Sequence, residues 1–325
     1  MNRRNLLLGG AGAWTTGCLP WVGLSGCAAS DAPIRVAIND WIGYALLFLA
    51  REQGHIAEST ARLIEFPSNT ASMLALANRE VAAAALTLDE LLLAREGGLD
   101  VRVALVFDES HGADVVLAVP SVQRLADLRG KRLGVESSAV GALMLSRLLQ
   151  AAGLRMPDLV KVPLTADQHV SAYEAGEVDA VITFEPMASQ LRAAGARALL
   201  DSSHFPGLIV DVLAVHADAA ASSGAQIRAL IQGYFRAMQH LRTQPAEAAK
   251  VLGAQLSLGP DELAQALRGI RLPDLAENRR WLGGATPHLL EASQAVSAVM
   301  RASSLLRQAP ALADLCDPTF LPERA

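Results

Sequence analysis

Apolar residues recur along the first third of the chain in short strand-like runs, each followed by a segment with helical spacing. Residues 34–38 (IRVAI) predict a strand, and the apolar positions from Tyr44 to Gln53 predict a helix that Gly54 ends. The pattern then repeats, and it predicts strands over 61–66, 81–86 and 101–107, with helices that run to about Asn78 and Arg95. This β-α-β-α-β-α-β order predicts a mostly parallel sheet with helices on both faces.

A second α/β series follows, with strands predicted over 132–135, 159–162, 179–184 and 198–200 and helices over 137–152, 169–175 and 186–194. Two similar apolar segments bracket it, DVVLAV at 114–119 and DVLAV at 211–215. We interpret them as paired crossover strands that lead the chain into a second lobe and back. Two unrelated buried strands of common composition would give the same pattern.

The last third of the chain has the pattern of a helical region. Helical spacing continues from His216 to about Gln308, with breaks at Pro245, at Gly259-Pro260 and at Pro273. The tail from Pro310 to Ala325 shows neither the helical nor the strand-like spacing of apolar residues, and we expect it to be loosely ordered.

The first 26 residues are typical of an export signal. Arg3 and Arg4 precede a weakly apolar stretch that is too short and too rich in glycine for a membrane span. Leu24-Ser25-Gly26-Cys27 then matches a bacterial lipobox, which predicts lipidation of Cys27; an ordinary signal peptide with a free cysteine is the alternative, and Cys18 is a weaker candidate. The opening arginine pair fits a twin-arginine export motif and the general secretion route equally well.

Composition narrows the class of protein. A chain of 325 residues is longer than a domain with a single ordinary hydrophobic core, so we expect two domains or one unusually large one. Hydrophobic residues make up 51% of the chain and charged residues 19%, which excludes a disordered chain. A net charge of −5 without a basic stripe argues against nucleic-acid binding. The cysteines, at 18, 27 and 316, form no CxxC motif or Cys/His cluster, so we expect no metal site and no cofactor. No GxSxG, HExxH, P-loop or GxGxxG motif indicates an enzyme.

Four stretches, in family order, resemble the periplasmic solute-binding proteins of the nitrate, sulfonate, taurine and thiamine-precursor import family. Residues 34–44 (IRVAINDWIGY) resemble the opening strand and ligand loop, and 47–54 (LFLAREQG) resemble the first helix. Residues 125–135 (LADLRGKRLGV) resemble the entry into the second lobe, and 176–186 (GEVDAVITFEP) resemble a later strand-to-helix turn. Each stretch is weak alone, and their shared order makes the resemblance specific.

The resemblance implies a two-lobe α/β fold of the type 2 periplasmic-binding-protein kind, with two mostly parallel sheets, a two-strand hinge and a helical carboxyl-terminal region. We expect a signal peptide over 1–26, a tether over 27–33, lobe 1 over 34–113 and 212–308, lobe 2 over 114–211 and a tail over 309–325.

The resemblance also implies a function. It points to a monomeric substrate-binding lipoprotein of an ABC-type importer, which captures a small organic solute and delivers it to permease and ATPase subunits. Such a protein would lie in the periplasm and touch the membrane only through its lipid. One alternative is a sensory lipoprotein that presents its ligand to a receptor. Another is an enzyme of the same fold, in pyrimidine synthesis or the menaquinone pathway, although an export signal argues against an enzyme that works inside the cell.

Candidate ligand contacts follow from the position of turns beyond the carboxyl ends of strands, where ligands of open α/β sheets bind and helix amino termini offer free N–H groups. We expect contacts from Asp40, Trp41, Tyr44, Ser68, Asn69, Thr70, Thr87, Asp89, His111, Glu136, Ser137, Ser138 and Glu185. Helix capping alone would explain Ser68 and Thr87, and core packing would explain the two aromatic residues. For His111 the alternative to ligand contact is a structural role, and for Glu185 the alternative is a position in solvent.

Charge at these turns favours one class of ligand. Four acids, Asp40, Asp89, Glu136 and Glu185, fall in predicted cleft turns, and none of these turns contains a lysine or arginine. A bare inorganic anion would depend on helix termini alone. A small organic ligand with amine or ring-nitrogen donors fits this pattern better.

Overall fold

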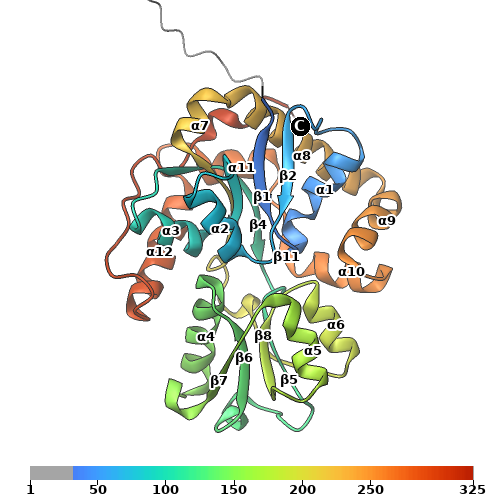
Figure 1. Cartoon of the computed structure of the whole chain (residues 1–325), viewed down its shortest axis with the longest axis vertical. Coiled ribbons are helices and arrows are strands. Elements are labelled where there is room, and N and C mark those ends of the chain that lie inside the picture. Colours follow the sequence, from blue (N-terminus) through green and yellow to red (C-terminus); the bar gives the residue numbers. More distant parts are fainter. Residues whose placement is uncertain (1–31, 325) are drawn as a thin grey trace, which may run out of the picture.

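The computed structural model describes residues 32–324. The predicted signal segment, its lipobox and Cys27 lie outside these residues. The chain forms two lobes, each built on its own sheet with helices on both faces (Figure 1). The two-lobe α/β fold expected from the sequence is confirmed.

Lobe 1 contains a sheet of strand order β11-β4-β10-β3-β1-β2. Its amino-terminal elements are β1 (Ile34–Ile38), α1 (Ala45–Glu52), β2 (Ala61–Glu65), α2 (Asn69–Ala77), β3 (Ala83–Thr87), α3 (Leu88–Glu96) and β4 (Val101–Ser110). Its carboxyl-terminal elements are β10 (Val210–His216), α7 (Ala217–Ser222), α8 (Gly224–Thr243), α9 (Pro245–Leu256), α10 (Pro260–Arg268), β11 (Ile270–Arg271), α11 (Leu275–Leu282) and α12 (His288–Ala302). The short strand β11 interrupts the region that was expected to be wholly helical, because Ile270 and Arg271 extend the sheet beside β4.

Lobe 2 contains a sheet of strand order β7-β6-β8-β5-β9. Its elements are β5 (Val115–Ala118), β6 (Arg132–Glu136), α4 (Ala139–Ala152), β7 (Val160–Leu164), α5 (His169–Glu174), β8 (Ala180–Thr183), α6 (Met187–Ala193) and β9 (Arg197–Asp201). Helix α4 packs on one face of this sheet, and α5 and α6 pack on the other (Figure 1).

Both sheets are mixed, which corrects the expectation of mostly parallel sheets. Strand β1 is parallel to β2 and β3, and β6 is parallel to β7 and β8. Strand β10, however, is antiparallel to β3 and β4, and β5 is antiparallel to β8 and β9. The reason is the crossing between lobes: β5 and β10 each start at the hinge, whereas β8 and β3 end there.

The two-strand hinge is also paired differently from the prediction. The similar segments at 114–119 and 211–215 lie in different sheets, in β5 of lobe 2 and β10 of lobe 1. The chain crosses between lobes at residues 111–114 and 202–209, and the crossing chains run side by side because β4 pairs with β10 and β5 pairs with β9. Similar composition therefore reflects similar burial of the two strands and not contact between them.

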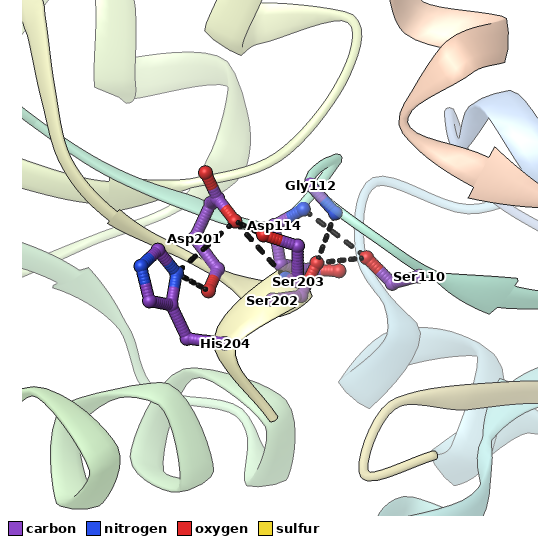
Figure 2. Close-up of polar contacts among 7 residues, drawn as sticks. All are labelled: Ser110, Gly112, Asp114, Asp201, Ser202, Ser203 and His204. Carbon is purple, nitrogen blue, oxygen red and sulfur yellow. Dashed lines mark hydrogen bonds and ion pairs between the residues drawn. The ribbon is translucent and has the colours of Figure 1, made fainter. Parts of the chain in front are cut away.

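Hydrogen bonds tie the two crossing segments together (Figure 2). The hydroxyl oxygens of Ser110 and Ser202 lie 2.8 Å apart, and the Gly112 N–H donates to Ser202 Oγ at 2.7 Å. The Ser202 N–H donates to the carbonyl oxygen of Asp114 at 2.9 Å. Gly112 has φ = 116°, a conformation that favours glycine. The network fixes the position of the backbone at Asp114.

The tail is packed, which corrects the expectation of loose order. Val103 in β4 donates its N–H to the carbonyl oxygen of Leu315 at 2.7 Å, and Leu315 and Phe320 are only 1% and 4% exposed. Two well-spaced apolar side chains thus anchor a segment without any periodic pattern. None of the helices among residues 32–324 combines the length and the apolar character needed to cross a bilayer.

Candidate functional site

A narrow cavity, which we name the cleft chamber, lies where the two lobes and the hinge meet. Its walls come from both lobes and the hinge, and they consist of Asn39, Trp41, Asn69, Thr87, Asp114, Val140, Phe184, Ile209 and Asp211. The centre of a water-sized sphere can move through only about 20 Å³ of this chamber. That is room for water and not for an organic molecule, so the lobes must part to admit a solute.

Trp41 spans the cleft from lobe 1 to lobe 2. Its indole Nε1 donates to Asp108 Oδ2 at 3.1 Å, and its ring meets Phe184 of lobe 2 edge to face with 5.9 Å between ring centres. Gly43 permits this arrangement, because a Cβ there would lie 1.7 Å from Asp108 Oδ2. The loop after β1 therefore contributes one wall of the chamber through a contact that exists only when the lobes are together.

Two carboxylates, Asp114 from the hinge and Asp211 from β10, line the chamber. Asp211 Oδ1 accepts a hydrogen bond from the Tyr44 hydroxyl at 2.6 Å, and the Asp211 side chain lies within hydrogen-bonding reach of Asp108. Asp114 Oδ2 has no hydrogen-bond partner within residues 32–324. The side chains are nearly inaccessible, with Asp114 4% and Asp211 1% exposed. Burial raises the pKa of Asp114 to about 7 and raises the pKa of Asp211 well above its ordinary range, where repulsion from Asp108 adds to the effect.

More acids lie directly behind these two. Burial raises the pKa of Asp108 to about 8 and the pKa of Asp89 to about 6. Burial and the charge of Asp89 raise the pKa of Glu90 well above its ordinary range.

Neutral oxygen atoms complete the chamber's hydrogen-bonding surface. Asn39 Oδ1 and Asn69 Oδ1 are buried and have no partner in the part of the chain that the structure describes. An unpaired buried polar atom costs about 1–3 kcal/mol. A ligand with several N–H donors would satisfy these acceptors. No lysine or arginine lines the chamber among residues 32–324, and no group of three His, Cys, Asp or Glu side chains there could hold a metal ion.

A second cavity, the inner chamber, lies within lobe 2 and shares three wall residues with the cleft chamber. The shared residues are Asp114, Val140 and Phe184, and the other walls are Glu136, Gly141, Met144, His169, Ile182 and Thr183. Burial raises the pKa of Glu136 and lowers the pKa of His169 to about 4. The imidazole is therefore neutral near pH 7.

The structure brings some of the predicted contact residues to these chambers. Trp41, Asn69 and Thr87 line the cleft chamber, and Glu136 lines the inner one. Tyr44 lies behind the cleft chamber, where its hydroxyl orients Asp211. Asp89 is fully buried beside Glu90 and lines neither chamber.

Other predicted contact residues lie away from both chambers. Asp40 and Ser137 are exposed, and Thr70 is half-buried outside the lining. Ser68 and Ser138 accept hydrogen bonds from the N–H groups of Ala71 and Gly141, so they cap α2 and α4. Glu185 accepts from the Ser189 N–H and from Arg192, and His111 Nε2 lies 3.2 Å from a guanidinium nitrogen of Arg271. Helix capping and polar contacts within the protein therefore account for Ser68, Ser138, Glu185 and His111 in this structure.

Sequence reasoning did not select several residues that line the chambers. They are Asn39, Asp114, Val140, Gly141, Met144, His169, Ile182, Thr183, Phe184, Ile209 and Asp211. For the two aspartates a signal existed, because each directly precedes an apolar run, 115–118 or 212–215, where a charge is costly unless it has a role.

Comparison with known proteins decides the family. The NMT1/THI5-like family model matches residues 42–248, which is more than half of the chain. The chain belongs to the NMT1/THI5-like family. The matched range contains every residue of both chambers except Asn39 and Trp41.

This NMT1/THI5-like chain is similar in sequence or in fold to several proteins that are named as binding proteins and to an enzyme. A Brucella abortus (strain 2308) protein named as a binding protein is 26% identical over 187 residues, which is 56% of this chain and 54% of that protein. The match thus spans about half of that relative's length. The alkanesulfonate-binding protein SsuA from Xanthomonas axonopodis pv. citri, solved with bound MOPS, has a TM-score of 0.72 and 20% identity over 87% of this chain and 97% of that chain.

The desulfurization enzyme DSZB has a TM-score of 0.63 and 16% identity over 89% of this chain and 97% of that chain. At such identities the two structural likenesses establish the fold that these proteins share. The NMT1/THI5-like fold therefore serves both solute binding and catalysis.

Proposed function

We propose that this protein is the solute-binding component of an ABC-type importer and that it captures a small organic cation, with one or more N–H donors, between its lobes. The observation that carries the proposal is the pair of buried carboxylates, Asp114 and Asp211, that line the cleft chamber without a lysine or arginine beside them in the lining, within residues 32–324. The solute would then pass to permease and ATPase subunits in the membrane.

Electrostatics supports a cation and disfavours a sulfonate. An anion in the cleft chamber would lie among acidic side chains without a lysine or arginine in the lining to balance its charge, within residues 32–324. A protonated amine would instead favour the ionised form of these acids and make charge-assisted hydrogen bonds to it. We therefore infer that the ligand class differs from the alkanesulfonates of the structural relative.

The proposal includes the cellular setting. It places a monomer in the periplasm, held at a membrane only through lipid on Cys27, and assigns it binding without chemical conversion. The support is the lipobox in the sequence and the binding-protein relatives. A solute recovered unchanged after long incubation with the protein is the expected result, and a changed mass of the solute would indicate an enzyme like DSZB.

A thermal-shift panel tests the ligand class. Ligand that binds only the folded state raises the unfolding temperature. We expect primary amines and diamines to raise it and alkanesulfonates of matched length to leave it unchanged. Stabilisation by sulfonates and not by amines would overturn the proposal.

Two variants locate the effect. Asp114→Asn and Asp211→Asn keep the shape of each side chain and remove its charge, and each should weaken amine binding by about 2 kcal/mol, the value of a charge-assisted hydrogen bond. Asp314→Asn is the matched control: this exposed aspartate lies in the tail at φ = 53°, a conformation that asparagine tolerates. Equal loss in all three variants would show that the amines bind through overall charge.

A further inference from the structure

The inner chamber contains a polar atom that the proposed capture of a cation does not use. His169 is fully buried, and its Nε2 has no hydrogen-bond partner among residues 32–324. The chamber that it lines is next to the cleft chamber and shares the wall residues Asp114, Val140 and Phe184 with it. The far end of a solute held by Asp114 would meet His169 if it reaches past these shared walls.

The imidazole of His169 is held in a fixed orientation. Its Nδ1 lies 3.0 Å from Thr183 Oγ1, and its ring meets Phe184 edge to face with 6.2 Å between ring centres. If Thr183 donates to Nδ1, then Nε2 carries a proton and donates; if Nδ1 donates to Thr183, then Nε2 accepts. With either tautomer, Nε2 can therefore make one hydrogen bond that it does not make within the described residues.

The remaining walls define the chemistry of what this group would meet. The low pKa of His169 keeps the ring neutral, so it attracts no ionic partner. Val140, Met144 and Ile182 provide apolar sides, and Glu136 adds a second polar group at 8% exposure. The chamber has room for about one water-sized group, so it suits a single uncharged hydrogen-bonding group at the end of a chain and not the chain itself.

We propose that the inner chamber is the second half of the solute site and that His169 Nε2 hydrogen-bonds an uncharged polar group at the end of the solute opposite its amine. The inference rests on the proposed function, because Asp114 holds the cationic end. The solute is therefore bifunctional, with an amine at one end and a hydroxyl, amide or ring nitrogen at the other. The competing occupant of the inner chamber is a single water molecule.

Two isosteric probes separate these readings. The probe 4-aminobutan-1-ol differs from n-pentylamine in a hydroxyl group that replaces a methyl group, and a hydroxyl satisfies either tautomer of His169. Calorimetric titration of the full-length protein should show the amino alcohol binding about tenfold more tightly. In His169→Phe, which keeps a flat ring and removes Nε2, that preference should disappear or reverse. The matched control His288→Phe changes an exposed histidine on α12 and should keep the preference.

A second measurement does not depend on a variant that folds. In wild-type protein labelled with ¹⁵N-histidine, 4-aminobutan-1-ol should shift the Nε2 resonance of His169, and n-pentylamine should leave it in place. Equal affinity for the two probes together with an unmoved resonance would overturn the inner-chamber inference and leave cation capture intact. Failure of both amines to bind would contradict cation capture itself, and the inference would fall with it.

Discussion

Acidification should weaken the binding of an amine, because Asp114 must be ionised to pair with it. Burial raises the pKa of Asp114 to about 7 in the free protein, whereas an alkyl amine, like a lysine side chain, stays protonated up to about pH 10. The ionised fraction of Asp114 therefore falls from about nine tenths at pH 8 to about one hundredth at pH 5. If only that form binds, affinity falls about 90-fold, or roughly 2–3 kcal/mol.

Isothermal titration calorimetry at several pH values measures this effect directly. Repetition in buffers with different heats of ionisation also counts the protons released, and we expect release near pH 7 and below. Asp114→Asn should bind more weakly at pH 8 and lose much of the pH dependence, whereas Asp314→Asn should follow the wild type. Affinity that stays constant from pH 8 to pH 5, with no proton release, would refute the assignment of Asp114 as a contact of the cation.

Three further results are expected. Burial raises the folded-state pKa of Asp114 to about 7 and of Asp108 to about 8, above about 4 in the unfolded chain, so these acids should cost the free protein stability as pH rises from about 4 to about 8. Buried neutral His169 has the opposite effect below about pH 6.5, so the comparison starts there, and an unfolding temperature that is higher at pH 8 than at pH 6.5 would contradict this sign. Gly43→Ala should destabilise the fold by about 1–3 kcal/mol in urea unfolding, because its Cβ would overlap Asp108 Oδ2, and unchanged stability would show that the loop relaxes freely. Solute binding should change the fluorescence emission of Trp41, because its ring contacts lobe 2 only when the lobes close. Trp41→Phe should lose most of that change while Trp281 still emits. A full change in the variant would show that the response comes from another residue.

The fold was largely predictable because hydrophobic periodicity reports burial, and most strands and helices are buried on one side or both. Strand direction was not predictable from the sequence, because the hydrophobic pattern of a strand is the same whichever way the strand runs. Nothing in the run DVLAV at 211–215 shows that it joins the sheet of lobe 1 antiparallel to β3. The packed tail was missed for a related reason, since Leu315 and Phe320 act as isolated anchors without a period.

The candidate site was predictable where one turn after one strand supplies the residue. Asn69 comes in the turn region after β2 and Thr87 ends β3, and both line the cleft chamber. The acids that define its charge come from the hinge and from the start of β10, so their meeting depends on how the sheets exchange strands. Asp40 shows the opposite failure, because its neighbour Trp41 turns inward and leaves it exposed.

His169 illustrates a further limit. It begins a short helix, with neighbours that give no sign of a cavity, and only the packing of α5 against β8 brings it beside Thr183 and the inner chamber. A lone histidine in a sequence does not reveal whether its second nitrogen has a partner.

The most direct test is to identify what the protein binds in its own cell. Full-length protein purified without denaturation from its native host should retain solute, because the lobes enclose the cleft chamber. Release by unfolding and mass spectrometry should then yield a small organic molecule with a protonated amine and an uncharged polar group. Recovery of an organic sulfonate or another anion, bound at one molecule per chain, would contradict the account.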